Sequence, residues 1–191
     1  MTQLQFQELY NEAVDMLSEN LPNYLTYHCL EHTLYVLDRA IYIGKKEDVS
    51  EKDMQLLKIA ALYHDMGFIN TNIEHEQEGC EIARATLKKY PLSASELNSI
   101  CGMIKATKIP QNPQNHLESI LADADLEYLG TKHFQEGSDR LFTELKHFNP
   151  ALTTKQWSRI QKEFLTNHQY HTDFCKRYKK HRKNKNMEML D

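Results

Sequence analysis

The sequence predicts an all-α protein that forms a single domain over residues 1–191. Three observations predict this fold class. Six glycines and five prolines leave long uninterrupted stretches that suit helices, and the prolines stand at positions 22, 91, 110, 113 and 150. Helix start signals recur along the chain. No segment shows the alternation of apolar and polar residues that is typical of a half-buried strand.

The expected helices follow from two kinds of local signal. Apolar residues at helical spacing predict five of them, over residues 3–19, 29–44, 115–129, 132–147 and 170–186. The other four begin at residue pairs that fit the capping-box pattern, namely Ser50 with Asp53, Thr71 with Glu74, Ser93 with Glu96 and Thr153 with Gln156. These pairs predict helices over residues 51–66, 73–89, 94–107 and 154–167.

The helix expected over residues 51–66 ends in the most informative pair of the chain. The run from Met54 to Tyr63 is apolar around nearly the whole helix, which is typical of a central helix. His64 and Asp65 follow directly. Because ionisable groups are costly to bury unless they are neutralised or bind a cation, this pair indicates a metal site. Gly67 is a plausible stop for the helix.

Further histidines and carboxylates complete a candidate site. His28 and His32 are four residues apart, so in a helix both side chains lie on one face. Asp123 and Asp125 lie in a later amphipathic stretch and supply a late carboxylate. Imidazoles and carboxylates together suit Mn, Fe, Ni, Zn or Mg more than a soft metal.

The order His32, His64-Asp65, Asp123 resembles the HD superfamily of metal-dependent phosphohydrolases, which is named for the adjacent pair and is built from helices. The surrounding residues extend the resemblance, namely Tyr27-His28 with Thr33 and Val36, Leu62 to Phe68, His75-Glu76 with Gly79 and Ala83, and Asp123 to Leu126 with Leu129-Gly130. The resemblance covers about residues 22–132, and the C-terminal helices follow over residues 132–191.

The resemblance implies an HD-type helical bundle that binds one divalent metal ion through His32, His64, Asp65 and Asp123. Metal-activated water would cleave a phosphoester or phosphoanhydride of a small molecule, which we expect to be a nucleotide. His28 occupies the place of the acid that protonates the leaving oxygen. The alternative is a regulatory HD module that binds metal and nucleotide without turnover.

Two assignments within this site have alternatives. A helical wheel places Asp125 closer to the apolar face than Asp123, but the resemblance favours Asp123 as the ligand. Asp125 would then orient a ligand by a hydrogen bond. His75 and Glu76 either hold a second metal ion or orient the ligands of the first. Binuclear members tend to have histidines where this chain has residues 104–108, which favours one metal.

Charged residues elsewhere give weaker predictions. Lys105 and Lys108 are candidates for a phosphate clamp, although a solvated face is the more ordinary role of such lysines. A net charge of −4 gives no general attraction to nucleic acid, and the basic run over residues 176–183 fits a solvated helix end.

Compartment and redox state follow from what the sequence lacks. No stretch approaches the ~18 apolar residues of a membrane span, and the first residues have no signal-peptide pattern. We therefore expect a cytoplasmic protein without membrane contacts. The four cysteines form no Cys-x-x-Cys pair, which predicts reduced packing residues.

Overall fold

The computed structural model describes residues 1–190 and confirms the all-α prediction, because this part of the chain contains helices and no strand. The α-helices are α1 (Gln3–Asn20), α2 (Leu30–Lys46), α3 (Glu51–Tyr63), α4 (His75–Thr86), α5 (Ala94–Ala106), α6 (His116–Asp125), α7 (Phe134–Phe148), α8 (Thr154–Asn167), α9 (Asp173–Tyr178) and α10 (Lys180–Glu188). Short 3-10 helices are η1 (Met66–Ile69), η2 (Leu87–Lys89) and η3 (Glu127–Gly130). Within residues 1–190, no helix is both long and apolar enough to cross a bilayer.

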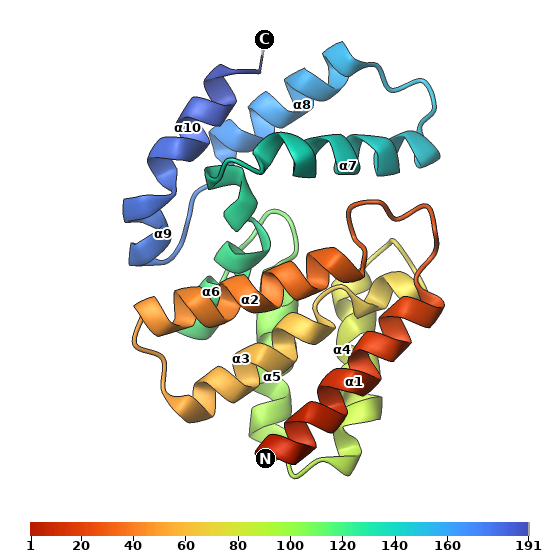
Figure 1. Ribbon diagram of the computed structural model, residues 1–191, viewed down its shortest axis with the longest axis vertical. Helices are drawn as coiled ribbons and strands as arrows, with labels where there is room; N and C mark the ends of the chain where they lie inside the picture. Colours follow the sequence, from red (N-terminus) through yellow and green to blue (C-terminus); the bar gives the residue numbers. More distant parts are fainter. Residues whose placement is uncertain (191) are drawn as a thin grey trace.

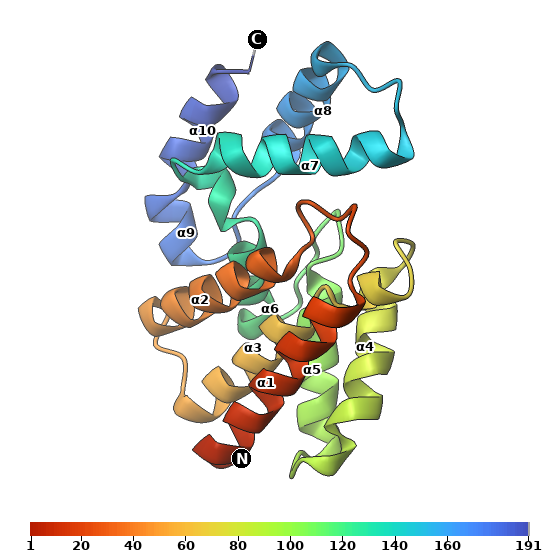
Figure 2. The same cartoon turned by 45° about the vertical axis from the view of Figure 1, so that its right-hand side comes forward.

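The helices form two groups along the long axis of the molecule. Helices α1 to α6 lie at the end that carries the N-terminus, and α7 to α10 lie at the other end (Figures 1 and 2). Helix α3 runs through the first group and is buried on nearly every side, with Leu57, Ile59 and Leu62 fully inaccessible to solvent. This agrees with the apolar run that predicted a central helix.

Several helix ends differ from the prediction. The capping boxes at Ser93 and Thr153 are present. Thr71, however, does not cap α4. Its hydroxyl accepts a hydrogen bond from the amide of Ile73 and donates one to the carbonyl of the same residue. Glu74 therefore precedes α4 with a left-handed φ of 55°, which few residues other than glycine adopt. The consequence is that His75 begins α4.

A close approach between η1 and α4 fixes the position of His75 from the other side. A Cβ atom on Gly67 would lie 1.9 Å from the carbonyl oxygen of His75, so no larger residue fits there without moving α4. Gly67 was expected only to stop the preceding helix. Its absence of a side chain also lets the segment after His64 and Asp65 pack directly on the start of α4.

The basic run over residues 176–183 is not simply a solvated helix end. Lys179 forms an ion pair with the buried carboxylate of Glu127. Lys183 is itself buried and donates hydrogen bonds to the carbonyl oxygens of Leu165 and His168 at the end of α8. The other residues of the run are exposed, as predicted. These two lysines differ because they satisfy groups that are distant in sequence, namely a buried acid and unpaired helix carbonyls.

Candidate metal centre

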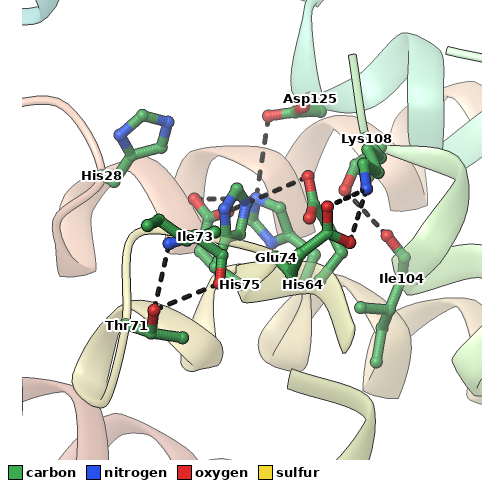
Figure 3. A network of polar contacts seen from close by, with 12 residues as sticks. His28, His64, Thr71, Ile73, Glu74, His75, Ile104, Lys108 and Asp125 are labelled. Atoms are coloured by element: carbon green, nitrogen blue, oxygen red, sulfur yellow. Dashed lines mark hydrogen bonds and ion pairs between the residues drawn. The ribbon is translucent and has the colours of Figure 1, made fainter. Parts of the chain in front are cut away.

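Three helices bring four charged or polar side chains to one point. His32 lies in the first turn of α2, and His64 and Asp65 follow the last residue of α3. Asp125 is the last residue of α6. Figure 3 shows His64 and Asp125 together with the neighbouring His28 and His75. Because each side chain stands at a helix end, its position is set by the packing of the helices and not by a loop.

The distances between these side chains are those of a compact cluster. His32 Nε2 lies 3.0 Å from Asp125 Oδ1 and 3.4 Å from Asp65 Oδ2. His64 Nε2 lies 3.2 Å from Asp65 Oδ2, 3.5 Å from His32 Nε2 and 3.7 Å from Asp125 Oδ1. The ligand atoms of His32, His64 and Asp125 all lie within 4.8 Å of one another.

A backbone hydrogen bond fixes which nitrogen of His64 faces the cluster. His64 Nδ1 lies 2.8 Å from the carbonyl oxygen of Ala61. A carbonyl only accepts hydrogen bonds, so Nδ1 carries a proton and donates it to Ala61, and Nε2 is the nitrogen that faces Asp65 and Asp125. The end of α3 thus orients this imidazole as a metal ligand is usually oriented.

The charges of the cluster depend on one another. Burial opposes ionisation of His64, yet Asp65 and Asp125 hold its pKa well above the usual value. Burial also opposes ionisation of the acids, but hydrogen bonds from His32 and His64 lower the pKa of Asp125 to about 2. The pKa of Asp65 is likewise lowered against burial, chiefly by His64. Both acids are therefore anionic, and the imidazoles of His32 and His64 are the partners that favour this form.

The cluster fits a divalent cation. Asp65 Oδ2 is a buried oxygen with no hydrogen-bond partner, although it lies close to two imidazole nitrogens. Neighbouring ligand atoms around an octahedral ion are ~3 Å apart, since each lies about 2.1 Å from the ion. The shortest of the separations above match that spacing. The group His32, His64 and Asp125, with Asp65 beside it, can therefore hold a metal ion of the kind that nitrogen and oxygen ligands select.

Asp123, which was predicted to be the late ligand, has a different role. Its Oδ1 accepts a hydrogen bond from the amide of His171 at 2.8 Å. Its Oδ2 accepts two more from the amide and hydroxyl of Thr172, at 2.8 and 2.6 Å. The fully buried carboxylate thus ties α6 to the start of α9. The structure places Asp125, not Asp123, beside the histidines.

His75 and Glu76 lie on the other side of Asp65. His75 Nε2 is 3.7 Å from Asp65 Oδ1 and 3.5 Å from Glu76 Oε1. Asp65 therefore lies between His32 and His64 on one side and His75 and Glu76 on the other. The sequence predicted that His75 and Glu76 either orient the ligands of the first metal ion or hold a second ion. Residues 104–108 supply no histidine beside them.

His28 lies at the edge of the cluster but not on helix α2, which begins only at Leu30. The expectation that His28 and His32 share a helix face was wrong, although their ring centres are still 6.0 Å apart. The His28 ring stacks on Phe68 at 4.3 Å, and Phe68 stacks on His75 at 3.9 Å. These contacts place His28 by packing instead of by helical spacing.

Glu144 of α7 is the functional candidate that the sequence prediction missed. Its carboxylate accepts hydrogen bonds from the backbone amides of Tyr27 and His28, at 2.8 and 3.0 Å, and lies 2.5 Å from His28 Nδ1. Although burial opposes it, this contact raises the pKa of His28 and lowers that of Glu144. The only sequence signal was an acid beside the apolar face of an amphipathic helix, which is too common to single out.

The two lysines proposed as a phosphate clamp are not brought to the site. Lys108 Nζ contacts the two carboxylate oxygens of Glu74 at 2.6 and 2.5 Å on the surface (Figure 3). Lys105 is exposed on α5. Neither lysine lines the cavity beside the cluster, which has a volume of about 440 Å³ and is bordered by His28, Asp65, His75 and Asp125 among others.

Comparison with known proteins agrees with this geometry. The family model described as the HD domain matches residues 29–127. A similar fold occurs in the crystal structure of a predicted HD superfamily hydrolase from an uncultured Thermotogales bacterium, with a TM-score of 0.63 and 20% identity over 94% of this chain and 88% of that one. No curated protein matches the sequence. Because the family model spans more than half of the 191 residues and includes the His64-Asp65 pair, this chain belongs to the HD domain family.

Proposed function

We propose that this protein is a metal-dependent phosphohydrolase that acts on a small phosphorylated molecule, with nucleotides as the first class to test. The observation that carries the proposal is the cluster of His32, His64, Asp65 and Asp125, with His28 beside it and the Glu144 carboxylate 2.5 Å from His28 Nδ1. These four residues would hold one divalent ion. The chemistry that such an ion supplies is activation of water and stabilisation of negative charge on a phosphoryl oxygen.

His28 is the proposed general acid. Glu144 fixes its Nδ1 atom and favours the imidazolium form, so the second ring nitrogen carries a proton that can be donated. His28 lines the same cavity as Asp65 and Asp125. A phosphoryl group at the metal site would thus have its leaving oxygen within reach of an acid, and proton transfer to that oxygen accompanies cleavage of the P–O bond.

The alternative is a regulatory module that binds metal and ligand without turnover. A binding module needs the four ligand residues but has no need for an imidazolium held by a buried carboxylate. The His28–Glu144 pair therefore favours catalysis. One metal per chain is favoured as well, because residues 104–108 contain no histidine to complete a second site next to His75 and Glu76.

The test combines metal analysis with a substrate panel. The purified protein is loaded with Mn or another divalent ion, the metals per chain are counted, and phosphate release is measured from nucleotides and other phosphate esters. We expect one metal and turnover that His64→Ala abolishes, while the matched change His181→Ala on the exposed part of α10 does not. Activity that survives His64→Ala would contradict the proposal, and ligand binding without turnover would favour the regulatory module.

A further inference from the structure

The cavity beside the metal centre is polar at one end and apolar along its length. Its polar end is formed by Asp65 and Asp125 of the cluster and by His28, His75 and Glu76. The opposite wall comes from the C-terminal helices and consists mainly of large apolar side chains, among them Phe134, Leu141, Leu145, Trp157, Ile160 and Phe164. A substrate whose phosphorus lies at the metal centre therefore has the rest of its body against α7 and α8.

The charges around this cavity disfavour a second phosphate. Neither lysine nor arginine occurs among its lining residues, whereas Asp65, Glu76 and Asp125 all line it. The β- and γ-phosphates of a polyphosphate carry negative charges that need cations or many donors when they leave water. Lys108 lies in sequence between two lining residues, Thr107 and Ile109, but it forms an ion pair with Glu74 outside the cavity.

The wall also offers few partners for a polar body. Apart from the cluster and the residues beside it, its side chains with hydrogen-bonding atoms are Tyr27, Tyr128, Thr107, Gln161 and Trp157. The indole N–H of Trp157 already donates to the hydroxyl of Ser138 at 3.2 Å. The hydroxyl of Thr107 is already engaged with the carbonyl of Ile104 at 2.8 Å. Sugar hydroxyls buried here would lose water without regaining equivalent hydrogen bonds, and this loss disfavours them.

We infer that the substrate is a phosphate monoester with a single phosphoryl group on an uncharged, predominantly apolar or aromatic body. This inference rests on the proposed function and narrows it, because nucleoside di- and triphosphates and sugar phosphates fall outside the class. A nucleoside monophosphate meets the condition of a single phosphate, but its sugar hydroxyls place it below the longer alkyl esters. Selectivity then comes from burial of the body along α7 and α8, and the metal centre anchors the phosphoryl group.

The direct test is a series of unbranched alkyl phosphates from ethyl to octyl, compared with AMP, ATP and glycerol 3-phosphate at one fixed concentration of free metal ion. We expect kcat/KM to rise about fourfold for each added methylene until the cavity is filled. AMP should exceed ATP by about a hundredfold or more. A flat alkyl series, or ATP or glycerol 3-phosphate used as well as the longer esters, would overturn the inference.

A variant pair locates the effect in the wall. Ile160→Ser on α8 places a hydroxyl in the apolar wall and should flatten the alkyl series. The control Leu4→Ser alters an exposed apolar residue of α1 and should leave the series unchanged. Melting temperatures show whether each variant is folded. If Ile160→Ser does not fold, the wild-type series still decides. If folded Ile160→Ser shows the same rise of kcat/KM with alkyl chain length as the wild type, the apolar wall does not select the substrate.

This experiment also separates the inference from the function on which it rests. If some phosphate ester is hydrolysed but the preference is for polyphosphates or polar bodies, only the inference fails. If no ester is hydrolysed, the proposed function fails, and the inference is then tested by binding. Octyl phosphate should raise the melting temperature of the metal-loaded protein more than ethyl phosphate or ATP at equal concentration, and the reverse order would reject it.

Discussion

The two ends of the molecule differ in chemistry. The helices from α2 to α6 hold buried imidazoles and carboxylates that meet at helix ends, and they fall within residues 29–127, which the family model matches. Helices α7 and α8 lie outside that match and present a mainly apolar wall to the same cavity. Glu144 of α7 does not line the cavity but contacts His28, which does. In the function proposed above, the first group carries the metal chemistry and the second selects the substrate that reaches it.

The largest expected effect comes from changing the two aspartates of α6 separately. Asp125→Asn should remove bound metal and lower kcat by about a thousandfold or more, because it weakens a ligand that two histidines face. Asp123→Asn should keep the metal but destabilise the fold by about 2 kcal/mol, because it disturbs three hydrogen bonds to a buried carboxylate.

Elemental analysis, steady-state kinetics and urea unfolding measure these effects. The two variants act as controls for each other, since the same change is made two positions apart on one helix. Loss of metal from a folded Asp123→Asn variant would show that the chemistry is not confined to the cluster described above.

The next largest effect tests Glu144, the acid of α7 that contacts His28. Glu144→Gln should lower kcat by about 10- to 100-fold with metal content unchanged, because His28 loses the partner that orients it and keeps it protonated. If His28 is the acid, the loss should be much smaller with p-nitrophenyl phosphate, whose leaving group needs no proton. Glu136→Gln on the exposed face of α7 is the control. An equal loss with every leaving group would mean that Glu144 is only structural.

A third prediction concerns the stability of the C-terminal helices in acid. Burial, and then the nearby Lys183 and His171, lower the pKa of His168 to about 3. In the unfolded chain the pKa is about 6.5, so between these values the unfolded state binds a proton that the folded state does not. The free energy of unfolding should therefore fall as the pH drops below about 6.5, by about 2 kcal/mol at pH ~5.

Urea unfolding near neutral pH and near pH ~5 measures this loss. In His168→Gln the contribution disappears, so the difference between the two pH values should shrink. Tyr170, which packs edge-on against His168, titrates only above its ordinary range and adds nothing in this window. An undiminished acid sensitivity in the variant would assign the effect to other groups.

The smallest expected effect belongs to the surface lysines of the first group of helices. Lys105→Ala and Lys108→Ala should each change kcat/KM for a monoester by less than about twofold, because neither side chain lines the cavity and surface ion pairs contribute little. A tenfold loss of kcat/KM in either variant would support the phosphate-clamp hypothesis for these lysines. It would also mean that the substrate makes a contact outside the cavity.

Local patterns in the sequence were sufficient for the fold class and for most of the metal cluster. The apolar run before His64 predicted the central helix because burial of a whole circumference needs apolar residues at every position. The capping boxes at Ser93 and Thr153 act within three residues, so they can be read directly from the sequence. His32, His64 and Asp65 were assigned as ligands because their order along the chain resembles that of the HD superfamily.

Tertiary structure alone decided the remaining assignments, because they depend on residues that are far apart in the sequence. Asp125 meets His32 across 93 positions, and Glu144 meets His28 across 116. The apolar face of α6 had favoured Asp125 over Asp123, yet only the hydrogen bonds of Asp123 to Thr172 decide between them. Which helix face packs against which partner is set by burial over the whole chain, and a local pattern does not contain that information.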